Sequence, residues 1–115
     1  MDDARIWDFE ERLWKAEDAF YRENVDPACV MALPTPPFVA AGDEAVRAVV
    51  GTPRWSSVQF DDRAVTRPQE GLIVIGYTVT AKDGQQSWKA HCTSVYRRQG
   101  HEDWTVIQHA QVPAT

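Results

Sequence analysis

The residues of this chain that could do chemistry gather near its C-terminal end. The stretch HCTSVYRRQGHEDWTVIQHAQ, residues 91–111, holds all three histidines of the 115 residues and one of the two cysteines. Two kinds of site are open to such a set. A zinc site needs three or four converging nitrogen or sulfur ligands, and a cysteine nucleophile needs a neighbouring histidine to favour its thiolate. Which of them can form depends on the strands that carry these side chains.

The second half of the chain is patterned as long antiparallel strands. Strands are predicted over residues 55–67, 72–81, 87–98 and 103–112. The first is interrupted at Asp61-Asp62, where we expect a bulge. Asp83-Gly84 indicates a tight hairpin between the second and third strands.

The strand register decides which of these side chains meet. With Asp83-Gly84 at the centre of one turn and a four-residue loop over 99–102, Cys92 lies opposite His109, and Ala90 lies opposite Gln111. Opposed residues share a face of the sheet. One face then collects Ile73, Ile75, Tyr77, Val79, Trp88, Ala90, Cys92, Tyr96, Ile107, His109 and Gln111. The other face carries His91 with Leu72, Val74, Val95, Trp104 and Val106.

This division argues against a metal centre. His101 falls in a turn, while His91 and His109 lie on opposite faces, so the three imidazoles do not converge. A Cys92–His109 dyad stays open as a pair of catalytic candidates. The competing interpretation is that Cys92 is a small buried apolar residue and His109 a hydrogen-bonded strand residue. With Gln111, these two side chains would form the polar floor of a pocket.

The first half of the chain is helical. Residues 3–24 carry an apolar stripe flanked by Trp7, Trp14 and Tyr21, and Pro27 ends this helix. A short strand over 28–33 and a second helix over 41–50, capped by Asp43, follow. Helices followed by a meander of antiparallel strands predict an α+β fold.

The helix and the aromatic-rich face supply candidates for a ligand pocket. Trp14, Tyr21, Tyr77 and Trp88 could line a site for a flat apolar molecule, or they could fill the core. Glu10 and Glu17 fall between the aliphatic stripe and its aromatic flank. A carboxylate held there could act as a general acid or base, or it could extend from the stripe edge into water.

The two faces also predict a partner. We expect the aromatic-rich face to lie under the first helix. The opposite face carries too many apolar residues for a solvated surface. A second copy of the chain would cover it most simply, giving a twofold-symmetric homodimer.

Composition excludes several classes of protein. The net charge of −5 argues against nucleic-acid and anionic-membrane binding. Cys29 and Cys92 form no CxxC pair, the acidic N-terminus lacks an apolar signal core, and no apolar run is long enough to span a membrane. We expect one domain over residues 1–115, in a reduced, cytoplasmic protein without a cofactor.

These elements, in this order, resemble the nuclear transport factor 2-like superfamily. The similarity is greatest to a small stand-alone bacterial branch, of unknown function, near the SnoaL-like and ketosteroid isomerase-like groups. It rests on Trp14, Asp18–Tyr21, VMALP (30–34), GDEAV (42–46), TPRW (52–55), Tyr77, CTSVYRR (92–98), Trp104 and HAQVP (109–113). That branch typically ends in His-Gln-Gln-Thr-Pro, from which Ala110 and Val112 depart. The resemblance implies a curved antiparallel sheet forming a cone around a pocket, closed by the N-terminal helix and often dimeric through its outer face.

Two functions from different classes follow. The first is a homodimeric module that binds a small apolar or aromatic molecule without catalysis. The second is a cofactor-free isomerase, dehydratase or hydrolase with His109 as general base. Steroid-type isomerisation, which needs an acidic base in the pocket, is not favoured, because the CVMAL strand at 29–33 offers no carboxylate.

Overall fold

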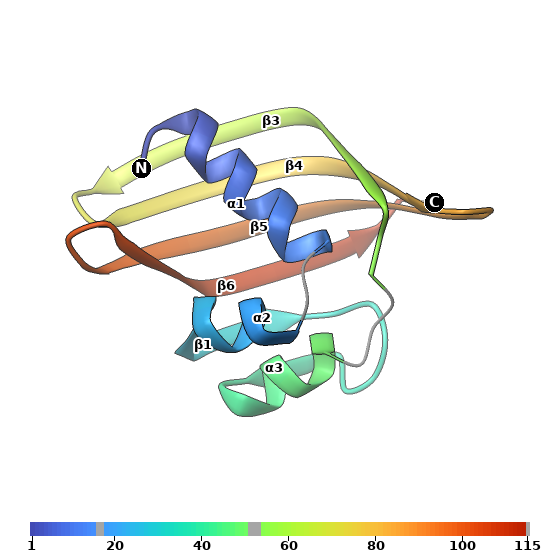
Figure 1. Ribbon diagram of the computed structural model, residues 1–115, viewed down its shortest axis with the longest axis horizontal. Coiled ribbons are helices and arrows are strands. Elements are labelled where there is room, and N and C mark those ends of the chain that lie inside the picture. Colours follow the sequence, from blue (N-terminus) through green and yellow to red (C-terminus); the bar gives the residue numbers. More distant parts are fainter. Residues whose placement is uncertain (16–17, 51–53, 115) are drawn as a thin grey trace.

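The computed structural model describes residues 1–15, 18–50 and 54–114 and shows an α+β fold (Figure 1). Its helices are α1 (Asp3–Lys15), α2 (Asp18–Asn24) and α3 (Asp43–Val50). Its strands are β1 (Val25–Ala32), β2 (Val39–Ala41), β3 (Ser57–Gln69), β4 (Leu72–Asp83), β5 (Gln86–Gly100) and β6 (Asp103–Pro113). None of the helices within the described ranges is both long and apolar enough to span a membrane.

The six strands form one open, mostly antiparallel sheet. Their order is β2-β1-β6-β5-β4-β3, and β1 runs parallel to β6 while every other pair is antiparallel. Figure 1 shows α1 lying across the long strands β3 to β5, with α2 and α3 grouped beside β1. The helices thus form a layer on one face of the sheet, and the core lies between this layer and the sheet.

The first strand begins earlier than its pattern predicts. Pro27 lies inside β1, whereas the sequence pattern predicts the end of a helix at Pro27 and a strand only after it. The pairing of β1 with β6 shifts between Val25 and Val30, and a proline is tolerated at such an irregular position because no regular ladder bond is required of it. The edge strand β2, only three residues long, was not predicted, because so short a segment has no period to detect.

Both predicted hairpin registers are wrong by two residues. The β4–β5 turn is centred on Gly84 and Gln85, with Asp83 paired to Gln86, and Gly84 has a φ of 60° that suits glycine. As a result, Cys92 lies opposite Tyr77 and Gln111, while His109 lies opposite Ser94. Because side chains alternate with a period of two, this slip leaves each of them on its predicted face.

The bulges have a different effect on the faces. The predicted bulge in β3 is confirmed between Asp61 and Ala64. In β6, Gln108 pairs with Val95 but Val106 pairs with Tyr96, so Ile107 is the extra residue of a second bulge.

This second bulge reverses the alternation before it. Trp104 and Val106 consequently join the buried inner face, which corrects their predicted place on the outer one. The inner face is the one under α1, as predicted, while His91 is exposed on the outer face.

A buried carboxylate fastens β1 to the two last strands. Asp26 is 2% exposed and accepts hydrogen bonds from the Ala28 amide, the Thr105 hydroxyl and the Arg97 guanidinium. Burial alone would raise the pKa of Asp26, but these bonds and the Arg97 charge outweigh it and leave that pKa lowered. The contacts hold β1 beside β6, which is where the inner face forms one wall of a cavity.

Candidate functional site

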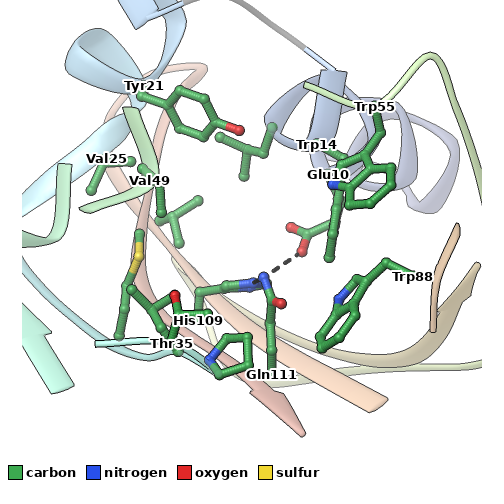
Figure 2. Close-up of a pocket in the computed structure, with 15 residues that line it drawn as sticks. Glu10, Trp14, Tyr21, Val25, Thr35, Val49, Trp55, Trp88, His109 and Gln111 are labelled. Atoms are coloured by element: carbon green, nitrogen blue, oxygen red, sulfur yellow. Dashed lines mark hydrogen bonds and ion pairs between the residues drawn. The ribbon is translucent and has the colours of Figure 1, made fainter. Parts of the chain in front are cut away.

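A cavity of about 230 Å³ lies between the helices and the inner face of the sheet (Figure 2). Its walls are mainly apolar, and its polar groups are few. It is lined by Glu10, Leu13, Trp14, Tyr21, Val25, Met31, Leu33, Pro34, Thr35, Val49, Trp55, Trp88, Val106, His109 and Gln111. The lining comes from α1, α2, α3, β1, β5, β6 and the loops between them, so this cavity exists only in the folded chain.

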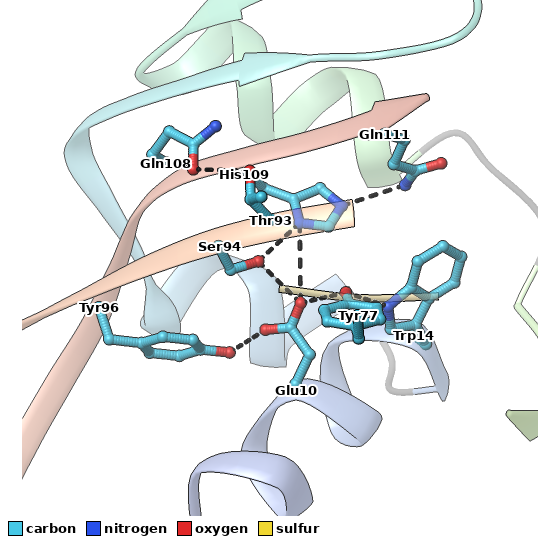
Figure 3. A network of polar contacts seen from close by, with 9 residues as sticks. All are labelled: Glu10, Trp14, Tyr77, Thr93, Ser94, Tyr96, Gln108, His109 and Gln111. Atoms are coloured by element: carbon cyan, nitrogen blue, oxygen red, sulfur yellow. Dashed lines mark hydrogen bonds and ion pairs between the residues drawn. The ribbon is translucent and has the colours of Figure 1, made fainter. Parts of the chain in front are cut away.

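Glu10 is the charged group at the centre of the site. It lies on the inward side of α1 and is 0% exposed. The Tyr77 and Tyr96 hydroxyls donate to its two oxygens, and the Ser94 hydroxyl donates to Oε2 at 2.7 Å (Figure 3). Three hydroxyl donors around one carboxylate replace the water that burial removes.

A second row of polar groups runs from Glu10 toward the cavity. His109 Nδ1 lies 2.8 Å from Ser94 Oγ and 3.7 Å from Glu10 Oε2. Its Nε2 lies 3.1 Å from the amide nitrogen of Gln111. The Trp14 ring stands edge-on to the imidazole at 6.2 Å, and Trp14 Nε1 donates to the Tyr77 hydroxyl at 3.0 Å. Figure 3 shows these side chains as one connected network under α1.

Burial sets the protonation states in this network. It lowers the pKa of His109 below 6.5, and the nearby Glu10 charge opposes that shift only in part. The imidazole is therefore neutral at pH 7. Because the unfolded chain takes up this proton at a higher pH, the free energy of unfolding falls as the pH drops below about 6.5. Burial and the Glu10 charge also raise the pKa values of Tyr77 and Tyr96, so both hydroxyls remain donors.

The predicted site residues do not all reach the cavity. Trp14, Tyr21, Trp88, His109 and Gln111 line it. Burial, followed by the charge of Glu10, raises the pKa of Tyr21 to about 12, although Arg54 offsets part of this rise. Glu17 lies outside the described residues.

Tyr77 and Cys92 pack beneath the lining, in the core. Burial and the Glu10 charge raise the pKa of the Cys92 thiol to about 12. Together with the corrected register, this protonated thiol gives no support to a Cys92–His109 dyad.

Part of this network was not predicted from the sequence. The sequence allowed two positions for Glu10, one held against the apolar stripe and one extending from its edge into water. The structure buries Glu10 completely. Ser94 and Tyr96 were given no role in the site. A signal was present, because Ser94 and Tyr96 are two residues apart on the inner face and Tyr77 lies on the same face, so three hydroxyls point toward the helix.

This arrangement can hold a small molecule and exchange a proton with it. The neutral imidazole is a weaker base than an exposed histidine, because burial lowers its pKa, and the carboxylate behind it can stabilise its protonated form. Within the described residues, no group of three or more histidine, cysteine, aspartate or glutamate side chains is placed to hold a metal ion.

We predict that Glu10 controls the titration of His109. In Glu10→Gln the imidazole loses the charge that favours its protonated form, so its pKa should fall further below 6.5. An NMR titration of the His109 ring protons measures this shift. Glu11→Gln, on the half-exposed side of the same helix, is the matched control and should leave the His109 pKa unchanged. An unchanged value in Glu10→Gln would show that the two groups are not coupled.

Comparisons with known proteins identify the fold but no sequence family. No family model and no curated protein matches the sequence. A candidate ketosteroid isomerase from Parabacteroides distasonis is structurally similar, with 19% identity, a TM-score of 0.82 and coverage of 96% of this chain and 86% of that one.

Two further structures are similar. An NTF2-like protein from Cytophaga hutchinsonii has 13% identity, a TM-score of 0.74 and coverage of 99% and 100%. A hub homology domain of the CamKII type from Chlamydamonas reinhardtii has 15% identity, a TM-score of 0.75 and coverage of 97% and 98%. At sequence identities this low, the similarity to these structures concerns the fold alone. The chain thus has the nuclear transport factor 2-like fold, as the resemblance in its sequence implies.

Proposed function

We propose that this protein binds a small, mostly apolar or aromatic molecule in the cavity under α1. The observation that carries the proposal is the cavity itself, whose apolar walls converge on one polar side formed by His109, Gln111 and Glu10. Pockets for drug-sized ligands measure about 300–1,000 Å³, and this one measures about 230 Å³. The ligand is therefore a smaller molecule, with room for one polar group against His109 or Gln111.

The buried network around Glu10 supports the proposal that this cavity is a functional site. A charged carboxylate with no exposed surface is a costly feature, and an apolar residue of similar size would stabilise the core at least as well. Functional sites are where such groups gather. The two cysteines are free and buried, which agrees with the proposed location in the reducing cytoplasm.

We predict that filling the cavity weakens this binding. Leu33→Trp places a bulky side chain at a half-buried lining position, and it should weaken the binding of indole and benzofuran by about tenfold or more, the equivalent of about 1.4 kcal/mol. His109→Ala should also weaken it. The affinities of the wild type and of each variant for indole and for benzofuran are measured by NMR titration of the backbone amides.

Ala19→Trp, on the exposed side of α2, is the control for the added bulk and should bind as the wild type does. If the wild-type protein binds neither compound, the cavity is not a site for small aromatic molecules. Equal affinity of wild type and Leu33→Trp would place any binding elsewhere.

The outer face of the sheet supports self-association. Val30, Val39 and Val112 are 48%, 67% and 61% exposed on β1, β2 and β6. Val74 and Val95 are half-buried on the same face, toward the middle of the sheet. A twofold interface here would cover this apolar strip with its own copy. That a structurally similar protein is a hub homology domain agrees with this proposal.

We predict that Val95→Glu yields a monomer. In a dimer through this face, the new carboxylate would be buried without a partner, which destabilises an interface by several kcal/mol. Light scattering after size exclusion should report twice the mass of one chain for the wild type and a single chain for the variant. Ala19→Glu adds the same charge on α2 and should remain dimeric. A monomeric wild type would remove the homodimer from the proposal.

A second candidate function is cofactor-free catalysis with His109 as general base, in an isomerase, dehydratase or hydrolase. It is favoured by one observation, the bridge through Ser94 that joins His109 to the Glu10 carboxylate. A base at Nε2 that takes a proton from a ligand becomes an imidazolium, and the carboxylate behind it stabilises that charge.

Proton exchange tests this second candidate. We predict that the protein speeds deuterium exchange at the carbons next to the carbonyl of 2-indanone in heavy water, followed by NMR. The exchange should be lost in His109→Gln and kept in His91→Gln, where the substituted histidine is exposed on the outer face. Exchange no faster than in buffer would exclude this catalytic function, and ligand binding would remain as the proposed function of the cavity.

A further inference from the structure

We infer that the cavity selects organic cations, small molecules that carry a substituted ammonium group, over uncharged molecules of the same shape. This rests on the proposed function and names the class of ligand that the same site takes. The reason is a negative charge without a positive partner. Glu10 is buried beside the cavity, and the groups that donate hydrogen bonds to it are neutral hydroxyls.

Two buried carboxylates of this chain differ in what surrounds them. Asp26 is 2% exposed, and the Arg97 guanidinium lies 2.9 Å from it and neutralises it. Glu10 is 0% exposed, and the hydroxyls around it satisfy its oxygens without cancelling its charge. The imidazole of His109, 3.7 Å away, is neutral at pH 7. A buried charge normally has a partner of opposite charge. Within the described part of the chain, Glu10 is left without one.

The lining of the cavity does not supply this partner. Of the described residues that line it, none is a lysine or an arginine, and Glu10 is the one that is charged at pH 7. Arg54 is not part of the lining, although its guanidinium stacks on the Tyr21 ring, 4.6 Å from the centroid. It forms an ion pair with Asp18 at 2.6 Å, so these two residues together add no net charge. The cavity therefore has a negative potential, which its apolar walls screen less than water would.

Aromatic side chains in the walls suit the same kind of ligand. Three tryptophans and one tyrosine border the space beside the Glu10 carboxylate in Figure 2, namely Trp14, Trp55, Trp88 and Tyr21. The faces of such rings attract cations, and tryptophan does so most strongly. A substituted ammonium group carries methyl or methylene groups in place of the hydrogens that bind water, so it enters an apolar cavity more easily than a bare ammonium ion. It matches both the apolar walls and the unpaired charge.

The neutral donors of the cavity do not reverse this preference. The indoles of Trp55 and Trp88 and the amide of Gln111 carry N–H donors, so they accommodate an alcohol, an ether or a carbonyl on the ligand. An anion would suit the same donors, but it would lie beside the Glu10 carboxylate, and like charges close together disfavour one another. The selection thus concerns charge, while the neutral polar groups of the ligand are free to vary.

Choline and 3,3-dimethylbutan-1-ol test the inference, because the alcohol has a carbon in place of the choline nitrogen and keeps its shape. Both are titrated at pH 7 and followed by NMR of the backbone amides. The wild type should bind choline about fivefold tighter or more, as a desolvated cation beside aromatic rings typically provides. In Glu10→Gln, which keeps the size of the side chain, the ratio of the two affinities should fall severalfold. Glu11→Gln removes a charge from the half-exposed side of the same helix and should keep the wild-type ratio.

A second pair of variants makes the test independent of how well Glu10→Gln folds. Thr35 lines the cavity at an exposed position, so a longer side chain there leaves the core undisturbed. Thr35→Lys gives the cavity a positive charge of its own and should lower the preference for choline. Thr35→Gln adds a side chain of similar reach without the charge and should keep that preference.

Each outcome separates the inference from the function beneath it. If the wild type binds choline no tighter than the alcohol, or if the ratio is the same in Glu10→Gln and Thr35→Lys as in the wild type, the selection of cations is wrong and the binding of uncharged molecules stands. If the protein binds neither of these compounds and neither indole nor benzofuran, the inference and the proposed function fall together.

Discussion

The burial of one carboxylate determines how this molecule is arranged around its cavity. Glu10 comes from the inner side of α1, and its two oxygens receive hydroxyls from Tyr77 on β4 and from Ser94 and Tyr96 on β5. A charge without water must be surrounded by donors. These contacts therefore hold the helix at one place on the sheet, since sliding it along would leave the carboxylate unpaired.

The same contacts organise the side chains next to the helix. Trp14, one turn beyond Glu10, donates to the Tyr77 hydroxyl and stands against the His109 ring. His109 is in this way enclosed by Ser94, Trp14 and Gln111, and its imidazole is kept neutral by burial. The inner end of the cavity is polar, whereas its other walls are mainly apolar side chains from the smaller helices and β1.

The structurally similar proteins are of different kinds, and they include a candidate ketosteroid isomerase and a hub homology domain. A fold that serves such different proteins says little about the activity of any one of them. We accordingly base the proposal of a ligand on this chain's own side chains, and above all on the connection between a buried carboxylate and an imidazole that faces a cavity.

Sequence periodicity alone determined the fold class and the face on which His109 lies. Alternation has a period of two, so the predicted registers could slip by two residues without moving Tyr77, Cys92, His109 or Gln111 to the other side. The partners of those residues, and the inward position of Trp104 and Val106, depended on a turn and a bulge that no local pattern reveals. Whether Glu10 would be buried or solvated was decided by tertiary structure, because three hydroxyls from distant strands had to meet at one point to replace its water.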